Sequence, residues 1–599
     1  MSRVIGIDFG TTNSLVSIIL DEQALSFVDE FSDRPHASMV CYAEGQTFCG
    51  RSAKERFNGA GSLINEGIVR SPKRMLGKGA IYVNGREMSA SQVVADLAQY
   101  LKDHATNWGN IDSDFGRAVV SIPVAMDGRV RRELRDAFLQ AGINIVQFVH
   151  EPLAALYAHF RRPSPDAKSY RDLLGELALV FDWGGGTLDL TICELGNESV
   201  SQIANFGDNE VGGDYIDEVL MRYVLDEVIS ARGFDSLVAE AQGARAELLE
   251  KCELAKIRLS EKEMAVIYVP NFFVNSDGNN DLEFSLSRAK FEELASTILS
   301  RGIGAIDRIL ERLDIDRRRI SLCLATGGVV NTPSVQDALI QLFGANRLHV
   351  SRRGDRIISE GCAWIAYDEA RLKLAKPLEL VEARQSYLSI FKAGDLLPTE
   401  GNALPADLIM YCVDPRDGVA KIKLARPRQI GKSAATDARD TYTNLSVRVE
   451  AGAKPFMERI EVGFRIDDDL IVNVSAYSAL LKDRDMAEIV DLEFSIETKK
   501  LVGVDVIEPR GDVNENRGVV QPKDLGALTL RSNVTSRNQR LDLVPGELLY
   551  GIKPALFDLR NPNPLPQLVI DERLFYEGCA VCGLQYNHAD CQCASQLPH

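Results

Sequence analysis

A weak internal repeat constrains the fold of this chain more than any other feature of its sequence. An apolar strand runs into Asp8, an aromatic residue and Gly10 in the stretch "IGIDFGTTNSLVSIIL". The same order returns at Asp182 in "LVFDWGGGTLDLTICEL", 174 positions later. In each copy a second alternating strand follows the small residues, so each copy predicts a β-hairpin with a tight turn. Two such hairpins indicate a duplicated nucleotide-binding fold.

Strand-like and helical segments alternate from residue 3 to about residue 375. Short runs such as "AVVSIPV" and "ISLCLATGG" stand between amphipathic runs such as "SASQVVADLAQYLKDHA". This alternation predicts α/β architecture with helix-covered sheets. We assign residues 1–375 to this two-lobed domain, because 599 residues are too many for a single core.

The sequence changes in character after residue 375. We expect residues 376–384 to be a linker and residues 385–496 to form an antiparallel β-domain, because the helical period disappears there. A near-ideal hairpin in this stretch turns at Asp467–Asp469. Residues 497–599 are rich in Pro, Gly and Asn and show no sustained helical period.

Charge and hydropathy bound the environment of the protein. The net charge of -18 is spread along the chain, which argues against a general binder of nucleic acid or anionic membranes. No apolar run reaches the roughly 18 residues that a membrane-spanning helix needs. The first residues, "MSRVIGIDFG", contain no signal-peptide core. We therefore expect a cytoplasmic protein with no nucleic-acid or membrane partner.

Both repeated turns have the composition of a phosphate site. A phosphate needs converging N–H and hydroxyl donors, and glycine lets the backbone come close. A magnesium ion needs carboxylates, often through water, and Asp8 and Asp182 end their strands beside the turns. The alternative is a pair of ordinary hairpins, and the repetition favours a clamp for phosphate. The candidate donors are Gly10, Thr11, Thr12 and Asn13 in the first turn and Gly184, Gly185, Gly186 and Thr187 in the second.

These segments resemble the DnaK-type 70-kDa heat-shock chaperones, which belong to the actin/hexokinase/heat-shock ATPase superfamily. Further similar stretches are "AVVSIPVAMDGRVRRELRDAFLQAGINIVQFVHEPLAALYAH", "LATGGVVNTPSVQDAL" and "SEGCAWIAY". The order and spacing agree across residues 3–368. The resemblance implies an actin-like, two-lobed Mg²⁺-dependent ATPase domain followed by a β-sandwich that binds peptides. Trp183 stands where that family usually has a smaller apolar residue.

The resemblance also implies roles for single residues in the hydrolysis of ATP to ADP. Asp8 and Asp182 would hold Mg²⁺ through water, and Lys73 would face the γ-phosphate and position the attacking water. Glu151 and Thr187 would help to place that water, while Thr11, Thr12 and Asn13 would bind phosphate. Pro123 and Arg131 match the pair that relays the nucleotide state, although Arg131 alone would be read as a solvated helix charge.

The side of the site that would bind the base is less regular. Glu253, Lys256 and Ser260 fall on one helix face, a spacing that by itself more often gives a solvated polar stripe. The resemblance assigns them to ribose and adenine. Asn331 stands where the family often has an arginine that stacks on adenine, so we expect weaker base stacking. The remaining matches near the nucleoside are Gly212, Gly213, Asp214 (in place of a longer Glu), Gly327 and Gly328.

The second half of the chain resembles the family less closely. The stretch "ERIEVGFRIDDDLIVNVSAYSALLKDR" is similar to the end of the peptide-binding sandwich, and a generic β-module is the alternative. The apolar linker of the family is interrupted here by Glu379. We predict no long helical lid in residues 497–599.

Four cysteines crowd into the last 21 residues. Their spacing, CxxC-x8-CxC, suits tetrahedral Zn²⁺, which can organise a segment too small to have its own core. A disulfide or redox pair and inert thiols are the alternatives. The zinc interpretation would make the tail an interaction module. The candidate ligands are Cys579, Cys582, Cys591 and Cys593, with His588 as a fifth.

Three functions are compatible with these observations. The first is an ATP-driven chaperone that binds unfolded peptides or a client protein, with a J-domain cochaperone and a nucleotide-exchange factor as partners. The second is an ATPase-fold adaptor that serves one protein partner. The third is a sugar kinase or filament-forming relative, against which the β-rich second half argues.

Overall fold

A computed structural model describes most of the chain, and the chain divides into two compact units. Unit 1 comprises residues 1–372 and 493–506, and unit 2 comprises residues 373–492 and 507–599. The described residues are 3–59, 67–108, 115–161, 168–208, 210–232, 240, 244–274, 280–351, 354–382, 387–428, 439–454, 457–502, 546 and 548–550. The candidate zinc ligands Cys579, Cys582, Cys591, Cys593 and His588 lie outside these residues, so the zinc prediction stays a prediction.

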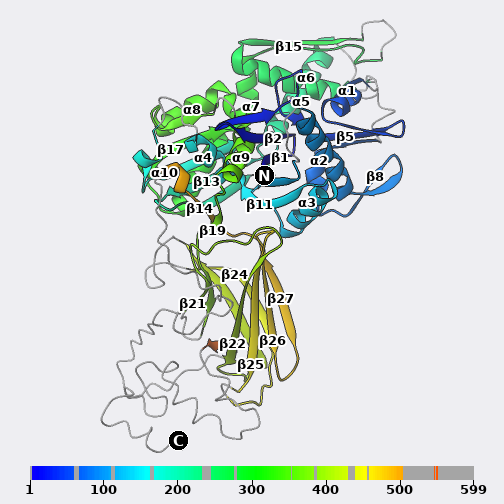
Figure 1. The fold of residues 1–599 in the computed structure, drawn as a ribbon. Coiled ribbons are helices and arrows are strands. Elements are labelled where there is room, and N and C mark those ends of the chain that lie inside the picture. Colours follow the sequence, from blue (N-terminus) through cyan, green and yellow to red (C-terminus); the bar gives the residue numbers. More distant parts are fainter. Residues whose placement is uncertain are drawn as a thin grey trace, which may run out of the picture. The chain divides into compact units, whose positions relative to one another are not determined.

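The first large sheet of unit 1 contains the first repeated hairpin (Figure 1). Strand β1 pairs antiparallel with β2 and parallel with β10, as a hairpin inside an α/β sheet would. Along the sheet the order is β11-β10-β1-β2-β3, and β4 also pairs with β2. The strands are β1 (Ile5–Phe9), β2 (Asn13–Leu20), β3 (Gln23–Phe27), β4 (His36–Ala37), β10 (Arg117–Ile122) and β11 (Asn144–His150).

The second large sheet repeats this arrangement. Strand β12 pairs antiparallel with β13 and parallel with β17, so the second hairpin has the same neighbours as the first. The order is β18-β17-β12-β13-β14-β28-β19. Both predicted hairpins are therefore confirmed. The strands are β12 (Leu177–Trp183), β13 (Leu188–Leu195), β14 (Ser199–Asp208), β17 (Ile320–Thr326), β18 (Leu348–Val350), β19 (Leu372–Leu374) and β28 (Phe494–Glu497).

Helices α4 (Glu151–Arg161) and α9 (Ile357–Tyr367) pack against each other and contact both large sheets. Helix α9 lies on β1, β2 and β10, while α4 contacts β11 and β12. Gly361 makes this helix pair possible, because a Cβ there would stand 2.0 Å from the Ala154 carbonyl oxygen. Other helices are α1 (Arg51–Gly59), α2 (Ala90–Asn107), α3 (Gly128–Gln140), α5 (Gly213–Arg232), α6 (Ala244–Glu261), α7 (Arg288–Arg312), α8 (Pro333–Phe343) and α10 (Lys499–Val502).

Smaller elements complete unit 1. A three-stranded sheet has the order β6-β5-β7, and β8 and β9 and also β15 and β16 form two-stranded sheets. Within the described residues, no helix is long and apolar enough to cross a membrane. The strands are β5 (Met39–Ala43), β6 (Gln46–Cys49), β7 (Ile68–Arg70), β8 (Ala80–Val83), β9 (Arg86–Ser89), β15 (Met264–Val269) and β16 (Leu282–Ser287), and the 3₁₀ turns are η2 (Pro72–Met75), η3 (Arg171–Leu173), η4 (Arg317–Arg319) and η5 (Gly328–Asn331).

Unit 2 consists of two antiparallel sheets, which confirms the predicted antiparallel β-domain. Phe391 from one sheet and Phe464 from the other meet edge to face in its core. One sheet has the order β21-β20-β23-β24 and the other β27-β26-β25-β22-β29. The strands are β20 (Leu378–Val381), β21 (Tyr387–Phe391), β22 (Ala403–Cys412), β23 (Val419–Pro427), β24 (Arg439–Arg448), β25 (Arg459–Asp467), β26 (Val472–Ser478), β27 (Arg484–Ile489) and β29 (Leu548–Tyr550).

The structure corrects the expected linker of residues 376–384. Leu378–Val381 forms β20, an inner strand that pairs with both β21 and β23. Glu379, which seemed to interrupt an apolar linker, is buried and its carboxylate binds the Arg439 guanidinium at 2.5 Å. An apolar run with one charge has the same pattern in a linker and in a strand, and only the distant ion-pair partner distinguishes them.

The expected boundary at residue 496 also changes. Strand β28 (Phe494–Glu497) belongs to the second sheet of unit 1, where Ser199, Val200 and Ser201 of β14 pair with it. The Phe494 amide donates to the Gln202 side-chain oxygen at 3.1 Å. The chain therefore leaves unit 1, forms the strands of unit 2 from β20 to β27 and returns to complete a sheet of unit 1.

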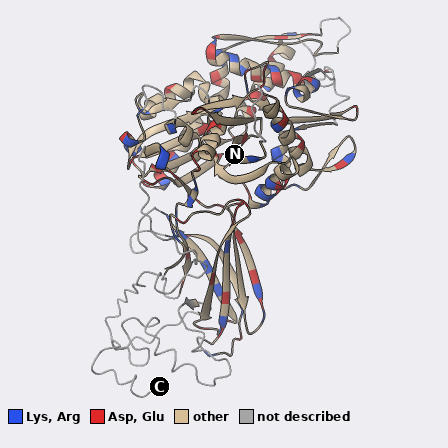
Figure 2. Ribbon diagram, viewed as in Figure 1, with Lys and Arg blue, Asp and Glu red and all other residues tan. Residues whose placement is uncertain are grey.

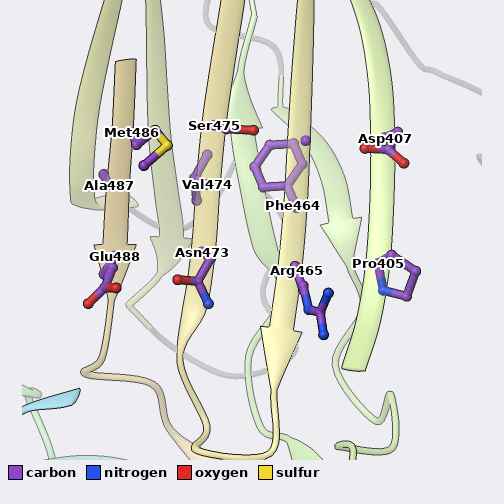
Figure 3. Close-up of a pocket in the computed structure, with 11 residues that line it drawn as sticks. Pro405, Asp407, Phe464, Arg465, Asn473, Val474, Ser475, Met486, Ala487 and Glu488 are labelled. Carbon is purple, nitrogen blue, oxygen red and sulfur yellow. The ribbon is translucent and has the colours of Figure 1, made fainter. Parts of the chain in front are cut away.

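The outward face of the five-stranded sheet contains a shallow hollow (Figure 3). Its floor is Gly463, which lies between Asp407 and Ser475 in the sheet register. A Cβ at this position would stand 3.1 Å from both of those side chains, so glycine leaves the floor open. Arg465 and the exposed Met486 stand beside it.

Candidate nucleotide site

Four carboxylates gather in unit 1 beside the turns of the two hairpins. Asp8 and Asp182 are the penultimate residues of β1 and β12. Asp189 faces Asp182 across the hairpin, and Glu151 begins α4. Burial raises the pKa of all four, and the charges of Glu151, Asp189 and Asp8 raise that of Asp182 further. The structure therefore brings together the predicted Asp8, Glu151 and Asp182. Asp189 was missed. It lies in the alternating strand that follows the second glycine turn, and the hairpin predicted there would have placed it opposite Asp182.

Lys73 supplies a positive charge to this cluster. Its ammonium lies 3.5 Å from the Glu151 carboxylate and is almost completely buried. Burial raises the pKa of Glu151 to about 7, against the opposing effect of Lys73. Ser71, just before the 3₁₀ turn that carries Lys73, has left-handed backbone with φ 53°. Lys73 thus reaches the cluster from a turn outside both hairpins, and its role toward a phosphate stays a prediction.

A hard cation fits the chemistry of this cluster. Four partly buried carboxylates and the charge of Lys73 leave an excess of negative charge, which a divalent ion would neutralise. Among the described residues, no three acidic, His or Cys side chains converge closely enough to ligate one ion directly. That Asp8 and Asp182 hold Mg²⁺ through its waters stays a prediction.

Hydroxyl groups support the first turn and were missed from the sequence. Ser121 Oγ donates to Asp8 at 2.8 Å, and this bond opposes the rise in the pKa of Asp8. Ser38 Oγ donates to the Gly10 carbonyl at 2.8 Å, and the Ser38 amide donates to the Thr12 carbonyl at 2.8 Å. Gly10 is required here, since a Cβ would stand 2.2 Å from the Asn13 carbonyl oxygen.

The second turn is bound to the N-terminus of α5. The Gly213 amide donates to the Gly184 carbonyl at 3.1 Å, and the Asp214 amide donates to the Gly185 carbonyl at 2.7 Å. A Cβ on Gly185 would also lie 3.2 Å from Thr12 Oγ1 of the first turn. The two predicted phosphate turns therefore face each other, with the predicted ribose turn beside the second.

Arg74 connects the turn that contains Lys73 with the second phosphate turn and Asp214, and it was not predicted. Its guanidinium lies 3.6 Å from the Asp214 carboxylate, and both side chains are about half exposed. A Cβ on Gly186 would stand 2.2 Å from the same guanidinium. Arg74 thus extends from the turn of Lys73 across the second phosphate turn. Its position directly after Lys73 was the signal that sequence reasoning passed over.

The predicted base-binding face on α6 is partly buried rather than a solvated stripe. Lys256 Nζ binds Asp217 at 2.6 Å and the Gly213 carbonyl at 3.1 Å, so it reaches the ribose turn. Burial raises the pKa of Asp217 to about 7, and Lys256 opposes this rise. Glu253 and Ser260 share the partly buried face with Lys256. Asp217 was missed because its partner is 39 positions away.

Gly327 and Gly328, the glycines predicted to lie near the nucleoside, pack on the strand that contains Asp182. Gly327 has φ +92°, and a Cβ there would stand 2.4 Å from the Trp183 carbonyl oxygen. Gly328 begins the 3₁₀ turn η5, and the exposed Asn331 ends it. The structure therefore places this turn directly beside the second phosphate hairpin.

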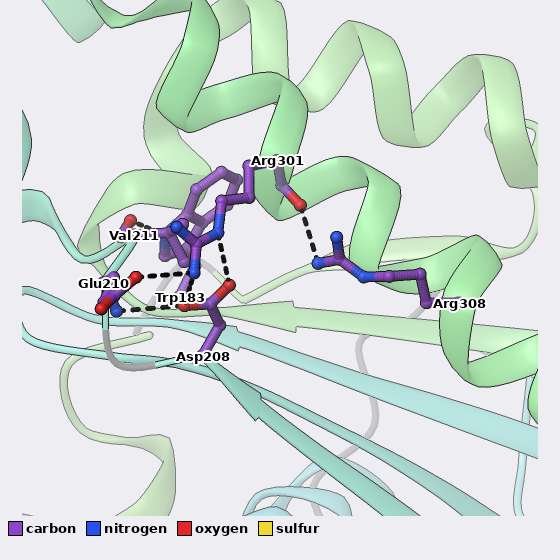
Figure 4. Close-up of polar contacts among 6 residues, drawn as sticks. All are labelled: Trp183, Asp208, Glu210, Val211, Arg301 and Arg308. Atoms are coloured by element: carbon purple, nitrogen blue, oxygen red, sulfur yellow. Dashed lines mark hydrogen bonds and ion pairs between the residues drawn. The ribbon is translucent and has the colours of Figure 1, made fainter.

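The buried Trp183 at the end of β12 connects this strand with the segment before α5 and with α7 (Figure 4). Its indole N–H donates to the Val211 carbonyl at 2.7 Å, one residue before Gly212. The far edge of the ring fills the space beside Gly302 of α7, where a Cβ would stand 2.2 Å from it. The neighbouring Arg301 binds Asp208 at 2.8 Å and Glu210 at 3.0 Å.

Arg131 is buried completely, so the reading as a solvated helix charge is wrong. Its charge lowers the pKa of His150, the residue before Glu151, in addition to the larger effect of burial. Arg131 on α3 therefore acts on His150, the residue before Glu151. Pro123 follows β10 and is partly buried, and the relay role of this pair stays a prediction.

Comparison with known proteins agrees with this geometry. The family described as "Hsp70 protein" matches residues 4–80 and 77–370. "Chaperone protein DnaK" from Metamycoplasma hominis is 28% identical over 483 residues, which cover 79% of this chain and 77% of that protein. The match thus extends beyond unit 1 into the sheets of unit 2.

Proposed function

The chain belongs to the Hsp70 family, and from that premise we propose that it is an ATP-dependent chaperone. Members of that family hydrolyse ATP, bind unfolded client peptides and work with J-domain and nucleotide-exchange cochaperones. In this proposal unit 1 hydrolyses ATP to ADP, and its nucleotide state controls the binding of client peptides by unit 2. The expected compartment remains the cytosol.

The ion pair of Lys73 and Glu151 inside the carboxylate cluster carries the proposal. Hydrolysis needs a positive charge at the γ-phosphate and a group that orients the attacking water. Lys73 supplies the charge. Glu151, with a pKa near 7, can accept a hydrogen bond or a proton from that water.

The remaining residues position the substrate. Thr12 and the second phosphate turn face each other and would hold the β- and γ-phosphates between them. Mg²⁺, held through water by Asp8 and Asp182, would neutralise charge on the transferred phosphoryl group. Lys256, beside Gly213, would contact the ribose. Asn331 offers no cationic face to adenine, so we expect phosphate contacts to supply most of the nucleotide affinity.

Single-turnover hydrolysis tests the assignment of Lys73. We expect Lys73→Ala to lower the rate by about 100-fold or more while ATP binding persists, because one electrostatic contact to the transition state is lost. Lys78→Ala, an exposed lysine five positions later, is the matched control and should keep the wild-type rate. A wild-type rate in Lys73→Ala would refute the assignment.

The breadth of client recognition separates the proposal from its alternative. A chaperone should show faster ATP turnover with many unrelated apolar peptides. An adaptor dedicated to one partner should respond to one protein and to none of the peptides. In the view of Figure 2, acidic and basic residues are interspersed along the described elements of both units.

A further inference from the structure

A short segment from the C-terminal region forms the outermost strand of a sheet in unit 2. Strand β29 runs antiparallel to β22, with Leu548 opposite Cys412, Leu549 opposite Tyr411 and Tyr550 opposite Met410. It stands at the end of the order β27-β26-β25-β22-β29. Paired residues in β22 and β29 are more than 130 positions apart, so this strand is brought in from far along the sequence.

Two more backbone hydrogen bonds fix the start of this segment. The Lys421 amide donates to the Gly546 carbonyl at 2.7 Å, and the Gly546 amide donates to the Asp414 carbonyl at 2.8 Å. The segment therefore crosses the turn between β22 and β23. Gly546 has φ +82°, and a Cβ there would stand 2.8 Å from the Val419 carbonyl oxygen, so this approach requires glycine.

Leu548 adds an apolar side chain to these backbone contacts. It is only 1% exposed. Residues opposite each other in an antiparallel pair project to the same face, so Leu548 lies on the face of the buried Cys412 and Met410. Backbone pairing at a sheet edge together with a buried apolar side chain is how an extended peptide binds by strand addition.

The edge of β22 is suited to a ligand of this kind. The Cys412 amide donates to the Glu458 carbonyl on the β25 side. Alternation along the strand then directs the backbone groups of Tyr411 to the opposite side, where β29 lies. Without a strand at that position these groups would form an open edge.

The far side of the domain offers less access. There the Ser446 amide of β24 donates to the Asp485 carboxylate at 2.9 Å, and the Arg448 amide donates to Asp483 at 2.7 Å. These contacts connect the edge strands β24 and β27 of the two sheets. The β22 edge is therefore a better place for an added strand than the side where β24 and β27 meet.

We propose that Gly546 and strand β29 form a built-in ligand of unit 2 that occupies the position of an extended client peptide. This inference rests on the proposed function and names its ligand class: extended peptides with an apolar residue of leucine type, bound by pairing with β22. Because the segment is tethered, it competes at every protein concentration. A client binds when it displaces the segment.

Binding of a labelled peptide to the full-length chain tests this proposal. The probe is a fluorescein-labelled peptide with the sequence of residues 544–552, VPGELLYGI. We expect Leu548→Glu to bind it about tenfold more tightly than the wild type, because a charge at the buried position releases the segment. Gly546→Val should act in the same direction through the backbone clash. Leu568→Glu, the same change elsewhere in the C-terminal region, should bind like the wild type.

Hydrogen exchange of the same proteins shows where the segment binds. In Leu548→Glu the amides of Tyr411 and Lys421 should exchange faster than in the wild type, and an excess of the unlabelled peptide should slow them again. Unchanged exchange in both variants would overturn the built-in ligand. Equal peptide affinity in the wild type and both variants would overturn it too, while leaving peptide binding intact. Faster exchange without peptide binding to any variant would refute peptide binding by unit 2 and this proposal with it.

Discussion

The two repeated hairpins have the same backbone and different supports. The first turn is held by hydroxyl groups, with Ser38 on its carbonyls and Ser121 on Asp8. The second is held by backbone amides of Gly213 and Asp214 and by the indole of Trp183, which bonds to Val211 and packs on Gly302. A duplicated motif therefore preserves the strand pairing that positions its carboxylates, while the surroundings that hold each copy in place have diverged.

The steric support of the second hairpin should give the largest effect. Gly302→Ala places a methyl group where the Trp183 ring stands and should lower the free energy of unfolding by about 3 kcal/mol. Trp183→Leu in the same chain should restore much of that loss. Denaturant unfolding followed by circular dichroism measures both effects.

The same helix contains a control for this change. Gly304→Ala adds its methyl group to open space, so it should be neutral or stabilising by up to about 1 kcal/mol. Equal losses at positions 302 and 304 would show that helix propensity, and not the fit of Trp183, determines the outcome. The proposal that the fit of Trp183 supports the second hairpin, while hydroxyl groups support the first, would then be wrong.

The hydroxyl support of the first hairpin should give a smaller effect. Ser121→Ala removes a hydrogen bond to the Asp8 carboxylate, which is worth about 1.5 kcal/mol. The pKa of Asp8 should rise further, and the Mg²⁺ concentration for half-maximal ATP turnover should increase about tenfold. Ser201→Ala, a hydroxyl that bonds to Ser495 away from the site, should leave the requirement for Mg²⁺ unchanged.

Acid should loosen the first hairpin before the second. His36 precedes the supporting Ser38, and burial lowers its pKa from 6.5 to about 4. The unfolded chain therefore binds the proton more readily, and the stability that neutral His36 contributes is present above pH 6.5 and lost between about pH 6.5 and 4.

Hydrogen exchange compared at pH 7 and pH 5 measures this difference. Amides of Asn13 and Ser14, which pair with β4, should lose protection at pH 5, while those of Leu188 and Asp189 should lose less. His36→Gln should remove the difference between the hairpins. Equal loss in both hairpins of the wild type would contradict a local role for His36.

Loss of the ion pair between Arg74 and Asp214 should have the smallest effect. Arg74 and Asp214 are both about half exposed, and such a pair contributes roughly 1 kcal/mol or less. Arg74→Ala should speed ADP release a few-fold at low salt. The effect should disappear at about 1 M salt, where the Debye length is about 3 Å. Stopped-flow release of a fluorescent ADP analogue measures it, and a salt-independent change would point to contacts other than this ion pair.

The sequence revealed those parts of the site that lie within a local pattern. Asp8 and Asp182 stand at the ends of apolar strands before glycine turns, and both hairpins follow from alternation alone. Lys73 and Glu151 came from the resemblance, since nothing near them in the sequence indicates a partner. Their closeness, 3.5 Å between charged groups, depends on the packing of a 3₁₀ turn against the start of a helix.

The missed features are pairings between distant segments. Ser38 and Ser121 look like ordinary loop and strand serines until the fold brings them to Gly10 and Asp8. Likewise, the charge of Glu379 suggested a broken linker, because Arg439, its partner, is 60 positions later. Burial and long-range pairing decide such residues, and neither leaves a periodic trace in the sequence.

The return of the chain to β28 has a practical consequence for dissecting this protein. The strand lies between β14 and β19, so its backbone completes a sheet from within. A fragment that stops after α9, the natural place to cut a two-part chain, would lack an interior strand and expose the edge of β14. Residues 373–492 of unit 2 are in this sense an insertion with two attachment points, and their excision with rejoining of the ends, not truncation, is the operation that would leave the second sheet of unit 1 whole.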